Sequence, residues 1–250
     1  IIGLSQGHLA VKAQGDVQRL DRAPGGTRQA RLAPDEGAGD VGRRFAALKT
    51  LGDKATRRHL KTGNAITVLR TGDEAYAAMI AAIAAAERSV ILETYIFDRD
   101  PLGLRVADAL IAAHERGVAV RVLIDAVGAR YSVPSIVGYL QKGGVPVDVF
   151  NGNIIIGLRL PYANLRTHRK LLIVDGRIAF AGGMNIRQGF TTEFAGEAAA
   201  HDTHFRVEGP VVEDLFGVAA EDWRFASGEE LAGDVWAITP QTATQGPTVL

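Results

Sequence analysis

Between residues 65 and 150, short apolar runs rich in β-branched residues alternate with segments of helical character. The runs read as strands at 65–70, 89–97, 118–125 and 145–150. Strands that are apolar throughout are typical of sheets covered on both faces, and strands alternating with helices are typical of α/β proteins. The alternation therefore predicts an α/β fold with a central mixed, largely parallel sheet flanked by helices.

The segments between these runs carry the expected helix signals. Thr71, followed three residues later by Glu74, resembles a capping box, and the helix after it places Tyr76 and Met79 on one apolar face. Gly117 follows the next helical segment, as expected of a residue that ends a helix. Further helices are predicted at about 104–116, 135–142 and 211–225.

Residues 168–185 read HRKLLIVDGRIAFAGGMN and concentrate side chains that carry chemistry. His168 and Lys170 lie two apart in an extended segment, so they project to the same face, with Arg169 on the opposite face. This pair suits a nucleophile or general base beside a cation that binds phosphate. Asp175-Gly176 predicts a hairpin turn between two short strands.

The end of this stretch offers contacts for an anionic ligand. Gly182-Gly183 allows the backbone to approach a ligand closely, and the amide of Asn185 can hydrogen-bond an oxyanion. Two carboxylates accompany the earlier strands. Glu93 interrupts a buried run and needs a partner, which is either a cation of the site or a structural arginine. Asp125 ends the next run, where a turn or helix cap is its expected use.

Composition excludes several kinds of site. The chain has no cysteine, so it has no disulfide framework, thiolate metal site or thiol nucleophile. Its net charge of zero conceals an asymmetry: residues 1–61 carry 12 basic against 6 acidic side chains, whereas residues 62–250 carry 16 against 22. The basic part could touch anionic lipid or nucleic acid. Its scattered charges instead favour a weakly ordered lead-in.

Three regions are expected. Residues 1–61 form a weakly ordered basic segment, residues 62–226 a folded domain, and residues 227–250 a linker or tail. No apolar run approaches the roughly 20 residues that span a bilayer. The chain does not begin with Met, so the natural N-terminus, with any membrane anchor it carries, is expected to lie upstream.

Written as a pattern, the central stretch is HxK, four residues, Asp, six residues and GGxN. This pattern resembles the signature of the phospholipase D superfamily. The segments LETYIFDRD at 92–100, HERGVAVRVLID at 114–125 and DTHFRVEGP at 202–210 are also similar to bacterial cardiolipin synthases. The resemblance covers roughly residues 64–226. It implies a phospholipase D-like α-β-α sandwich.

The resemblance also implies phosphodiester chemistry through a covalent phosphohistidine, without metal or cofactor. His168 would be the nucleophile, and Lys170 and Asn185, with Gly183, would bind the phosphate oxygens. Asp175 belongs to the signature's catalytic set, although its turn position suits a structural hydrogen bond or salt bridge better.

Two more acidic residues are expected near the histidine. Asp202, at the start of a strand predicted after the central stretch, is the acceptor expected to orient His168, and Glu93 is a candidate behind the primary site residues. His201 and His204 flank Asp202 but point to opposite faces of a strand, which argues against a shared metal.

One element of the implied site is missing. The family takes the general acid for the leaving alcohol from a second histidine on a second domain. The other histidines of this chain are His8, His59, His114, His201 and His204, and none has Lys two residues later. We therefore expect a second signature-bearing domain in cis or a second subunit as a partner.

The expected function is that of a cardiolipin synthase-type phosphatidyltransferase acting on a phosphatidylglycerol-like phospholipid. The expected location is the cytoplasmic side of a bacterial inner membrane, peripheral or anchored. Nucleic acid is disfavoured because the folded part is net acidic. The alternatives are a homodimeric single-signature phosphodiesterase or nuclease, and an inactive half-enzyme that only binds phosphate headgroups.

Overall fold

The computed structural model describes residues 51–52, 54–55, 61, 63–151 and 166–239. Most of the expected weakly ordered segment 1–61, including all of residues 1–50, and the end of the expected tail, 240–250, therefore lie outside the described residues. Within the described parts, no helix is long and apolar enough to cross a membrane.

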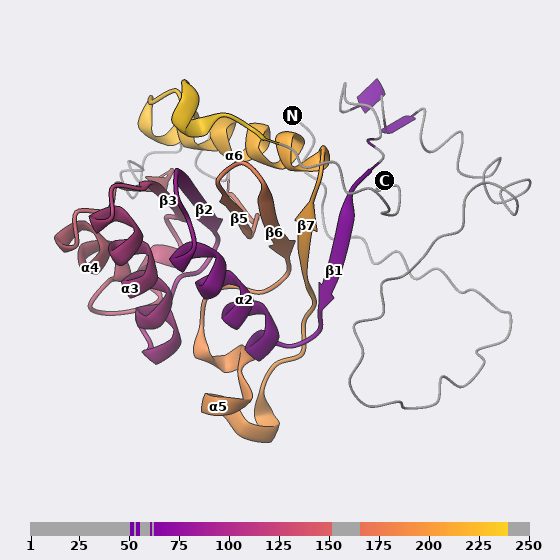
Figure 1. Ribbon diagram of the computed structural model, residues 1–250. Coiled ribbons are helices and arrows are strands. Elements are labelled where there is room, and N and C mark those ends of the chain that lie inside the picture. Colours follow the sequence, from indigo (N-terminus) through magenta and orange to yellow (C-terminus); the bar gives the residue numbers. More distant parts are fainter. Residues whose placement is uncertain (1–50, 53, 56–60, 62, 152–165, 240–250) are drawn as a thin grey trace, which may run out of the picture.

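A seven-stranded sheet in the order β1-β7-β6-β5-β2-β3-β4 forms the middle of the molecule (Figure 1). Its strands are β1 Ala65–Leu69, β2 Ser89–Thr94, β3 Ala119–Asp125, β4 Val147–Phe150, β5 Leu171–Val174, β6 Ile178–Gly182 and β7 His204–Glu208. All four strands predicted before residue 151 are present, with ends shifted by up to three residues.

The sheet is mixed, as predicted, but most neighbouring strands are not parallel. Only β2-β3 and β3-β4 pair in parallel. The pairs β1-β7, β7-β6, β6-β5 and β5-β2 are antiparallel. The expectation of a largely parallel sheet is wrong in this respect, because β5, β6 and β7 are neighbours in the sheet as well as in the chain, and each reverses the direction of the strand before it.

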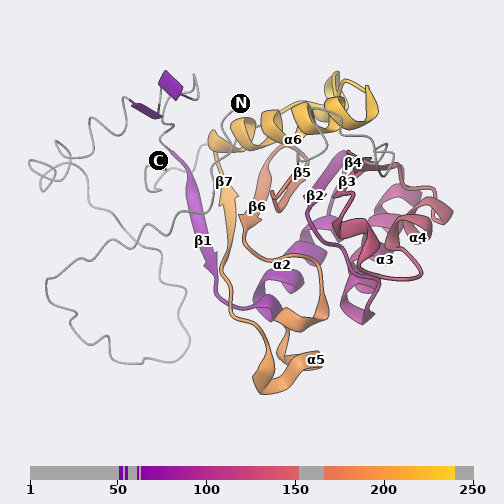
Figure 2. The ribbon, with the colours of Figure 1, turned by 180° about the vertical axis from the view of Figure 1, so that it is seen from behind.

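Helices cover both faces of the sheet. The structure has α2 Gly72–Ala84, α3 Pro101–Glu115, α4 Ile136–Lys142, α5 Thr192–Ala195 and α6 Val211–Ser227, with short 3₁₀ turns η1 Gly128–Arg130, η2 Gln188–Phe190, η3 Gly196–Ala198 and η4 Asp234–Trp236. Helices α2, α3 and α4 pack on one face, and α6 packs on the other (Figures 1 and 2). The predicted α-β-α sandwich is confirmed.

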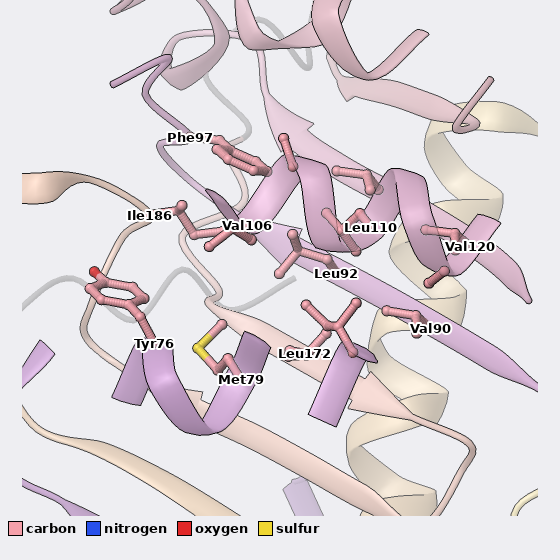
Figure 3. Packing of buried hydrophobic residues seen from close by; sticks show 14 of the residues in the cluster. Tyr76, Met79, Val90, Leu92, Phe97, Val106, Leu110, Val120, Leu172 and Ile186 are labelled. Atoms are coloured by element: carbon pink, nitrogen blue, oxygen red, sulfur yellow. The ribbon is translucent and has the colours of Figure 1, made fainter. Parts of the chain in front are cut away.

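Alternation along β2 feeds two separate cores. Val90 and Leu92 join the cluster beneath α2 and α3 (Figure 3), whereas Ile91 joins the cluster beneath α6. A strand apolar on both faces can serve both clusters at once, which explains why the run lacks a polar face. Glu93, next along the α6-facing side, is the exception, and it is fully buried.

Side-chain caps determine where the helices begin. Thr71 Oγ1 accepts a hydrogen bond from the Glu74 backbone N–H at 3.2 Å, and Glu74 Oε2 accepts one from the Arg70 N–H at 2.8 Å. Helix α3 starts three residues before its predicted position. Asp100 caps it by accepting from the Gly103 N–H at 2.8 Å, and Pro101 occupies the first helical turn.

Residues 228–239 were expected to form a linker or tail, but they pack against the domain. Leu231 and Trp236 are buried in the cluster beneath α6. The Thr239 N–H donates to the Gly176 carbonyl at 3.2 Å, which fastens this segment to the turn between β5 and β6. Two isolated apolar anchors make no periodic pattern, so this packing could not be predicted from local periodicity.

We predict that Trp236→Ala lowers the free energy of unfolding by about 3 kcal/mol, because a buried indole leaves a cavity when it is truncated. The matched control is Val235→Ala, whose side chain is exposed and whose loss should change stability by less than about 0.5 kcal/mol. Denaturant unfolding of both variants measures the difference. Equal stabilities would show that residues 228–239 do not pack on the domain.

Candidate active site

The candidate site lies at one edge of the sheet, the edge formed by the ends of the central strands. Because β2 and β6 run antiparallel to β5, the carboxyl ends of the first two meet the amino end of the third. The register pairs Glu93 with Leu171 and Leu171 with Ala181. His168 and Lys170, just before the start of β5, therefore lie at the same edge of the sheet as Asn185, which follows the end of β6.

Two buried carboxylates hold the residue before the histidine. The Thr167 N–H donates to Asp125 Oδ2 at 3.1 Å, and the Thr167 hydroxyl donates to Glu93 Oε1. Asp125 also accepts from the Val127 N–H at 2.9 Å, so the turn expected for this residue is present. Since Asp125 and Glu93 are both fully buried, Thr167 is fixed against the ends of β2 and β3.

Arg169 points to the face opposite His168, as predicted. Its guanidinium forms an ion pair with Asp222 of α6 and lies 3.9 Å from Glu93 Oε1. Glu93 thus meets a structural arginine, one of its two predicted partners. Burial, together with the charge of Asp222, raises the pKa of Glu93 to about 8. Glu93 therefore supports the segment from behind and does not face the site.

His168 is exposed, and its ring packs against Tyr95 with the ring centroids 4.9 Å apart. Partial burial and the positive charge of Lys170 lower the pKa of His168 below its ordinary value, against the opposing charge of Asp125. The imidazole is therefore mainly neutral at pH 7, which is the form that can act as a nucleophile.

Lys170 is 6% exposed, an uncommon burial for an ammonium group. Its Nζ donates to the His168 carbonyl at 2.7 Å and lies 5.4 Å from the centre of the Tyr95 ring. Burial lowers the pKa of Lys170 to about 8, although the charge of Asp202 acts in the opposite direction. A cation with so few partners among the described residues is well suited to bind an anion.

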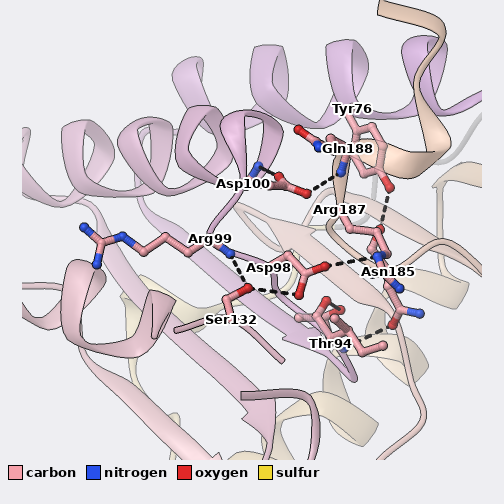
Figure 4. Close-up of polar contacts among 11 residues, drawn as sticks. Tyr76, Thr94, Asp98, Arg99, Asp100, Ser132, Asn185, Arg187 and Gln188 are labelled. Atoms are coloured by element: carbon pink, nitrogen blue, oxygen red, sulfur yellow. Dashed lines mark hydrogen bonds and ion pairs between the residues drawn. The ribbon is translucent and has the colours of Figure 1, made fainter. Parts of the chain in front are cut away.

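Asn185 is held on both its side chain and its backbone (Figure 4). Its Oδ1 accepts from the Ile96 N–H at 3.1 Å, and its carbonyl accepts from the Tyr76 hydroxyl. With the oxygen committed to the backbone, the amide nitrogen remains as a donor. It makes no hydrogen bond to any residue that the structure describes, as expected of a group that binds a phosphate oxygen.

The glycine pair serves the protein's own packing at this edge. A Cβ on Gly182 would lie 2.6 Å from the Thr203 carbonyl oxygen and 2.8 Å from His204 Cα. A Cβ on Gly183 would lie 2.3 Å from Asp202 Oδ2. The sequence predicted a close approach to a ligand, whereas in the structure the start of β7 makes the close approach.

Asp202 is close enough to Lys170 for its negative charge to raise the pKa of that residue. The expected hydrogen bond from His168 to Asp202, however, is not seen among the described residues. Asp202 Oδ1 accepts from the Thr203 N–H at 2.6 Å. Within the described part of the chain it has no hydrogen bond to His168, whose nearby acidic group is Asp125. The orienting role of Asp202 stays a prediction.

The two histidines beside Asp202 lie in different environments. His204 is buried, and burial lowers its pKa to about 4, so it is neutral. His201 is exposed. Among the residues with described positions, no group of three His, Cys, Asp or Glu side chains could hold a metal ion.

Asp175 lies at the opposite edge of the sheet, at the far end of β5. It adopts a φ of 54°, and its carboxylate accepts hydrogen bonds from the backbone N–H groups of residues 87–89, the shortest of them 2.7 Å from Arg88. The structure therefore does not bring Asp175 together with His168. Its structural alternative fits, and we assign it no direct part in catalysis.

Tyr95 was missed by reasoning from the sequence. It contacts both His168 and Lys170, and the only sign of this role was its position directly after the buried strand β2. Its ring covers one side of the histidine and the lysine. It therefore limits the directions from which a substrate can approach them.

We predict that Gly182→Ala lowers the free energy of unfolding by roughly 1–3 kcal/mol, because the new methyl group meets backbone atoms of β7 that cannot turn aside. Gly138→Ala in α4 is the control. Its added methyl group has nothing within 4 Å, and it should be neutral or stabilising by about 0.5–1 kcal/mol. Thermal or denaturant unfolding that ranks the two variants equally would contradict the close approach of β7.

Comparison with known proteins agrees with this architecture. Residues 79–200 match the family model described as the cardiolipin synthase phospholipase D-like domain. The chain is 37% identical over 163 residues to cardiolipin synthase B of Salmonella typhimurium, an alignment covering 65% of this chain and 39% of that protein. It is 32% identical over 203 residues to a cardiolipin synthase of Alkalihalophilus pseudofirmus, covering 80% of this chain and 39% of that protein.

A solved structure shares the fold. Nuc of Salmonella typhimurium, a phospholipase D family member, superposes with a TM-score of 0.50 at 21% sequence identity, covering 65% of this chain and 96% of Nuc. The chain spans about two fifths of the length of the curated relatives named above. The matched family model, the cardiolipin synthase relatives and the common fold support assignment of the chain to the phospholipase D superfamily, with a domain similar to that of cardiolipin synthases at residues 79–200.

Proposed function

We propose that this chain is one catalytic half of a cardiolipin synthase-type phosphatidyltransferase, which transfers a phosphatidyl group between a phospholipid and an alcohol. The observation that carries the proposal is the buried Lys170 ammonium beside the neutral imidazole of His168. A buried cation and a free amide donor on Asn185 form a site for the charge of a phosphodiester.

In the first step, a ring nitrogen of His168 attacks the phosphorus of a phospholipid such as phosphatidylglycerol. The N–P bond forms as the bond from phosphorus to the headgroup oxygen breaks, and the headgroup leaves as an alcohol after taking up a proton. Lys170 and Asn185 bind the non-bridging oxygens and stabilise the charge that these carry in the transition state. An acceptor hydroxyl then attacks the phosphohistidine: the new P–O bond forms as the N–P bond breaks, the hydroxyl proton passes to the group that protonated the leaving headgroup, and the imidazole is restored.

The proton for the leaving alcohol requires a second group. His204 is neutral and buried, and His201 is exposed in the segment before β7, where it makes no hydrogen bond with His168 in the described part of the chain, so we assign neither the role of the acid. We propose that a second signature-bearing domain, in cis or on a second copy of the chain, supplies a histidine for this step. The lipid substrate places the assembled enzyme at a membrane surface, where the inner face of the bacterial inner membrane is the proposed location.

We predict that the chain, combined with a second signature-bearing domain, takes up acid-labile label from phosphatidylglycerol labelled in its phosphate. His168→Ala should abolish the label, because His204, the other imidazole close to Lys170 in the described structure, is buried and out of reach of a substrate phosphate. His201→Ala is the matched control and should keep it. Rapid quenching followed by measurement of protein-bound label distinguishes the variants.

A His168→Ala variant that is still labelled would contradict the proposed nucleophile. A wild-type chain that binds phospholipid headgroups but is never labelled would favour the inactive half-enzyme instead. Cleavage of nucleic acid by a homodimer, with no transfer to lipid, would favour the phosphodiesterase.

A further inference from the structure

A polar cavity of about 420 Å³ opens beside the candidate site and is not used by the mechanism above. Its lining includes Asp98 and Arg187, from segments that follow β2 and β6 (Figure 4). Both segments continue the edge of the sheet that carries the site. Any molecule held at Lys170 and Asn185 with a polar extension would have this cavity as a neighbour.

The backbone places Arg187 on the same side as Asn185. The intervening Ile186 forms a parallel bridge with Phe97, its N–H donating to the Ile96 carbonyl at 3.1 Å and its carbonyl accepting from the Asp98 N–H at 2.9 Å. The segment is thus extended, and residues two apart share a side. At about 3.3 Å per residue, the Cα atoms of Asn185 and Arg187 are separated by roughly 7 Å.

The guanidinium of Arg187 is anchored but not saturated. Its Nε pairs with Asp98 Oδ2 at 3.0 Å, and the other Asp98 oxygen accepts from the Ser132 hydroxyl at 3.1 Å. The two terminal nitrogens of Arg187 make no hydrogen bond to the described residues, and the side chain is 42% exposed. An arginine oriented in this way offers a planar pair of donors, the geometry that binds phosphate.

The acidic residues of the cavity are already engaged. Asp98 is paired with Arg187, and Asp100 accepts from the Gly103 N–H at 2.8 Å and from the Gln188 N–H at 2.6 Å. Asp98, Asp100, Arg99 and Arg187 together contribute no net charge to the lining. Arg99 also lines the cavity, but its guanidinium lies over the Tyr139 ring, 5.2 Å from the ring centre. Arg187 therefore offers the cavity a guanidinium whose terminal nitrogens make no hydrogen bond to the described residues.

We propose that Arg187 binds a second phosphate, one joined through a three-carbon polyol to the phosphate held by Lys170 and Asn185. This inference rests on the proposed function and extends it. A phospholipid acceptor carries its own phosphate, whereas water or a simple alcohol does not. Arg187 then selects an acceptor of the phosphatidylglycerol class. In such an acceptor, one glycerol can join the phosphate at Arg187 to the phosphate held by Lys170 and Asn185.

The test measures binding of three soluble probes by calorimetry: inorganic phosphate, glycerol 3-phosphate and glycerol 1,3-bisphosphate. For the wild-type chain we expect the bisphosphate to bind about 10-fold tighter than glycerol 3-phosphate, because one additional charge-assisted contact contributes roughly 1.5 kcal/mol. Arg187→Gln should remove this advantage and leave the affinity for glycerol 3-phosphate unchanged. Arg177→Gln is the control, since Arg177 is an exposed arginine at the opposite edge of the sheet, and it should keep the advantage.

The wild-type comparison tests the inference even if Arg187→Gln fails to fold, which thermal unfolding would reveal. Equal affinities for the mono- and bisphosphate, or an advantage that survives in folded Arg187→Gln, would overturn it.

Lys170→Ala separates this inference from the proposed function. If glycerol 3-phosphate binding does not depend on Lys170, the proposed function fails. If it does depend on Lys170 but the bisphosphate has no advantage, only the second phosphate position fails. Inorganic phosphate binding as tightly as the bisphosphate would show a site for free phosphate and would also overturn the inference.

Discussion

The two hydrogen bonds to Thr167 are the interactions on which the candidate site most depends. Asp125 and Glu93 reach Thr167 from the ends of neighbouring strands, and both carboxylates are fully buried. Leaving a buried carboxylate without partners is costly. The segment 166–170 is thereby held in one position as it enters β5, and period-two alternation then turns His168 and Lys170 toward the site and Arg169 toward α6.

A second constraint acts from the other side of the sheet edge. The start of β7 approaches Gly182 and Gly183 so closely that no Cβ fits. This approach brings the negative charge of Asp202 near Lys170, which partly offsets the cost of burying the ammonium. The pKa of Lys170 still falls to about 8, so its local partners do not fully compensate for burial. A bound phosphate would supply the missing negative charge.

Much of this organisation could be predicted from the sequence because it follows from local rules. Buried strands appear as β-rich apolar runs, and the shared direction of His168 and Lys170 follows from strand geometry. The capacity of the Asn185 amide to bind an oxyanion was predicted from its residue type, and the family resemblance implies that this oxyanion is a phosphate. The structure places it at the same edge, with its amide oriented by the Ile96 N–H.

Other features depend on contacts between distant residues and had no local signal. The strand pairing around β5 is mainly antiparallel, and Leu231 and Trp236 anchor a segment that lacks periodicity. Tyr95 gains its role only when β2 lies beside β5. For Asp175 the sequence left two roles open, one in catalysis and one as a structural hydrogen-bond acceptor. The structural role is favoured only because Asp175 and His168 lie at opposite ends of β5. Spacing along the chain does not reveal which sheet edge a residue reaches.

The most direct test of the central claim is the position of a bound phosphate analogue. A crystal structure of the chain with tungstate should place the anion within hydrogen-bonding distance of Lys170 Nζ and the Asn185 amide nitrogen, with a ring nitrogen of His168 facing the metal atom of the anion. Tungstate bound elsewhere, or bound without contact to Lys170, would contradict the account of this sheet edge as a site for phosphoryl transfer.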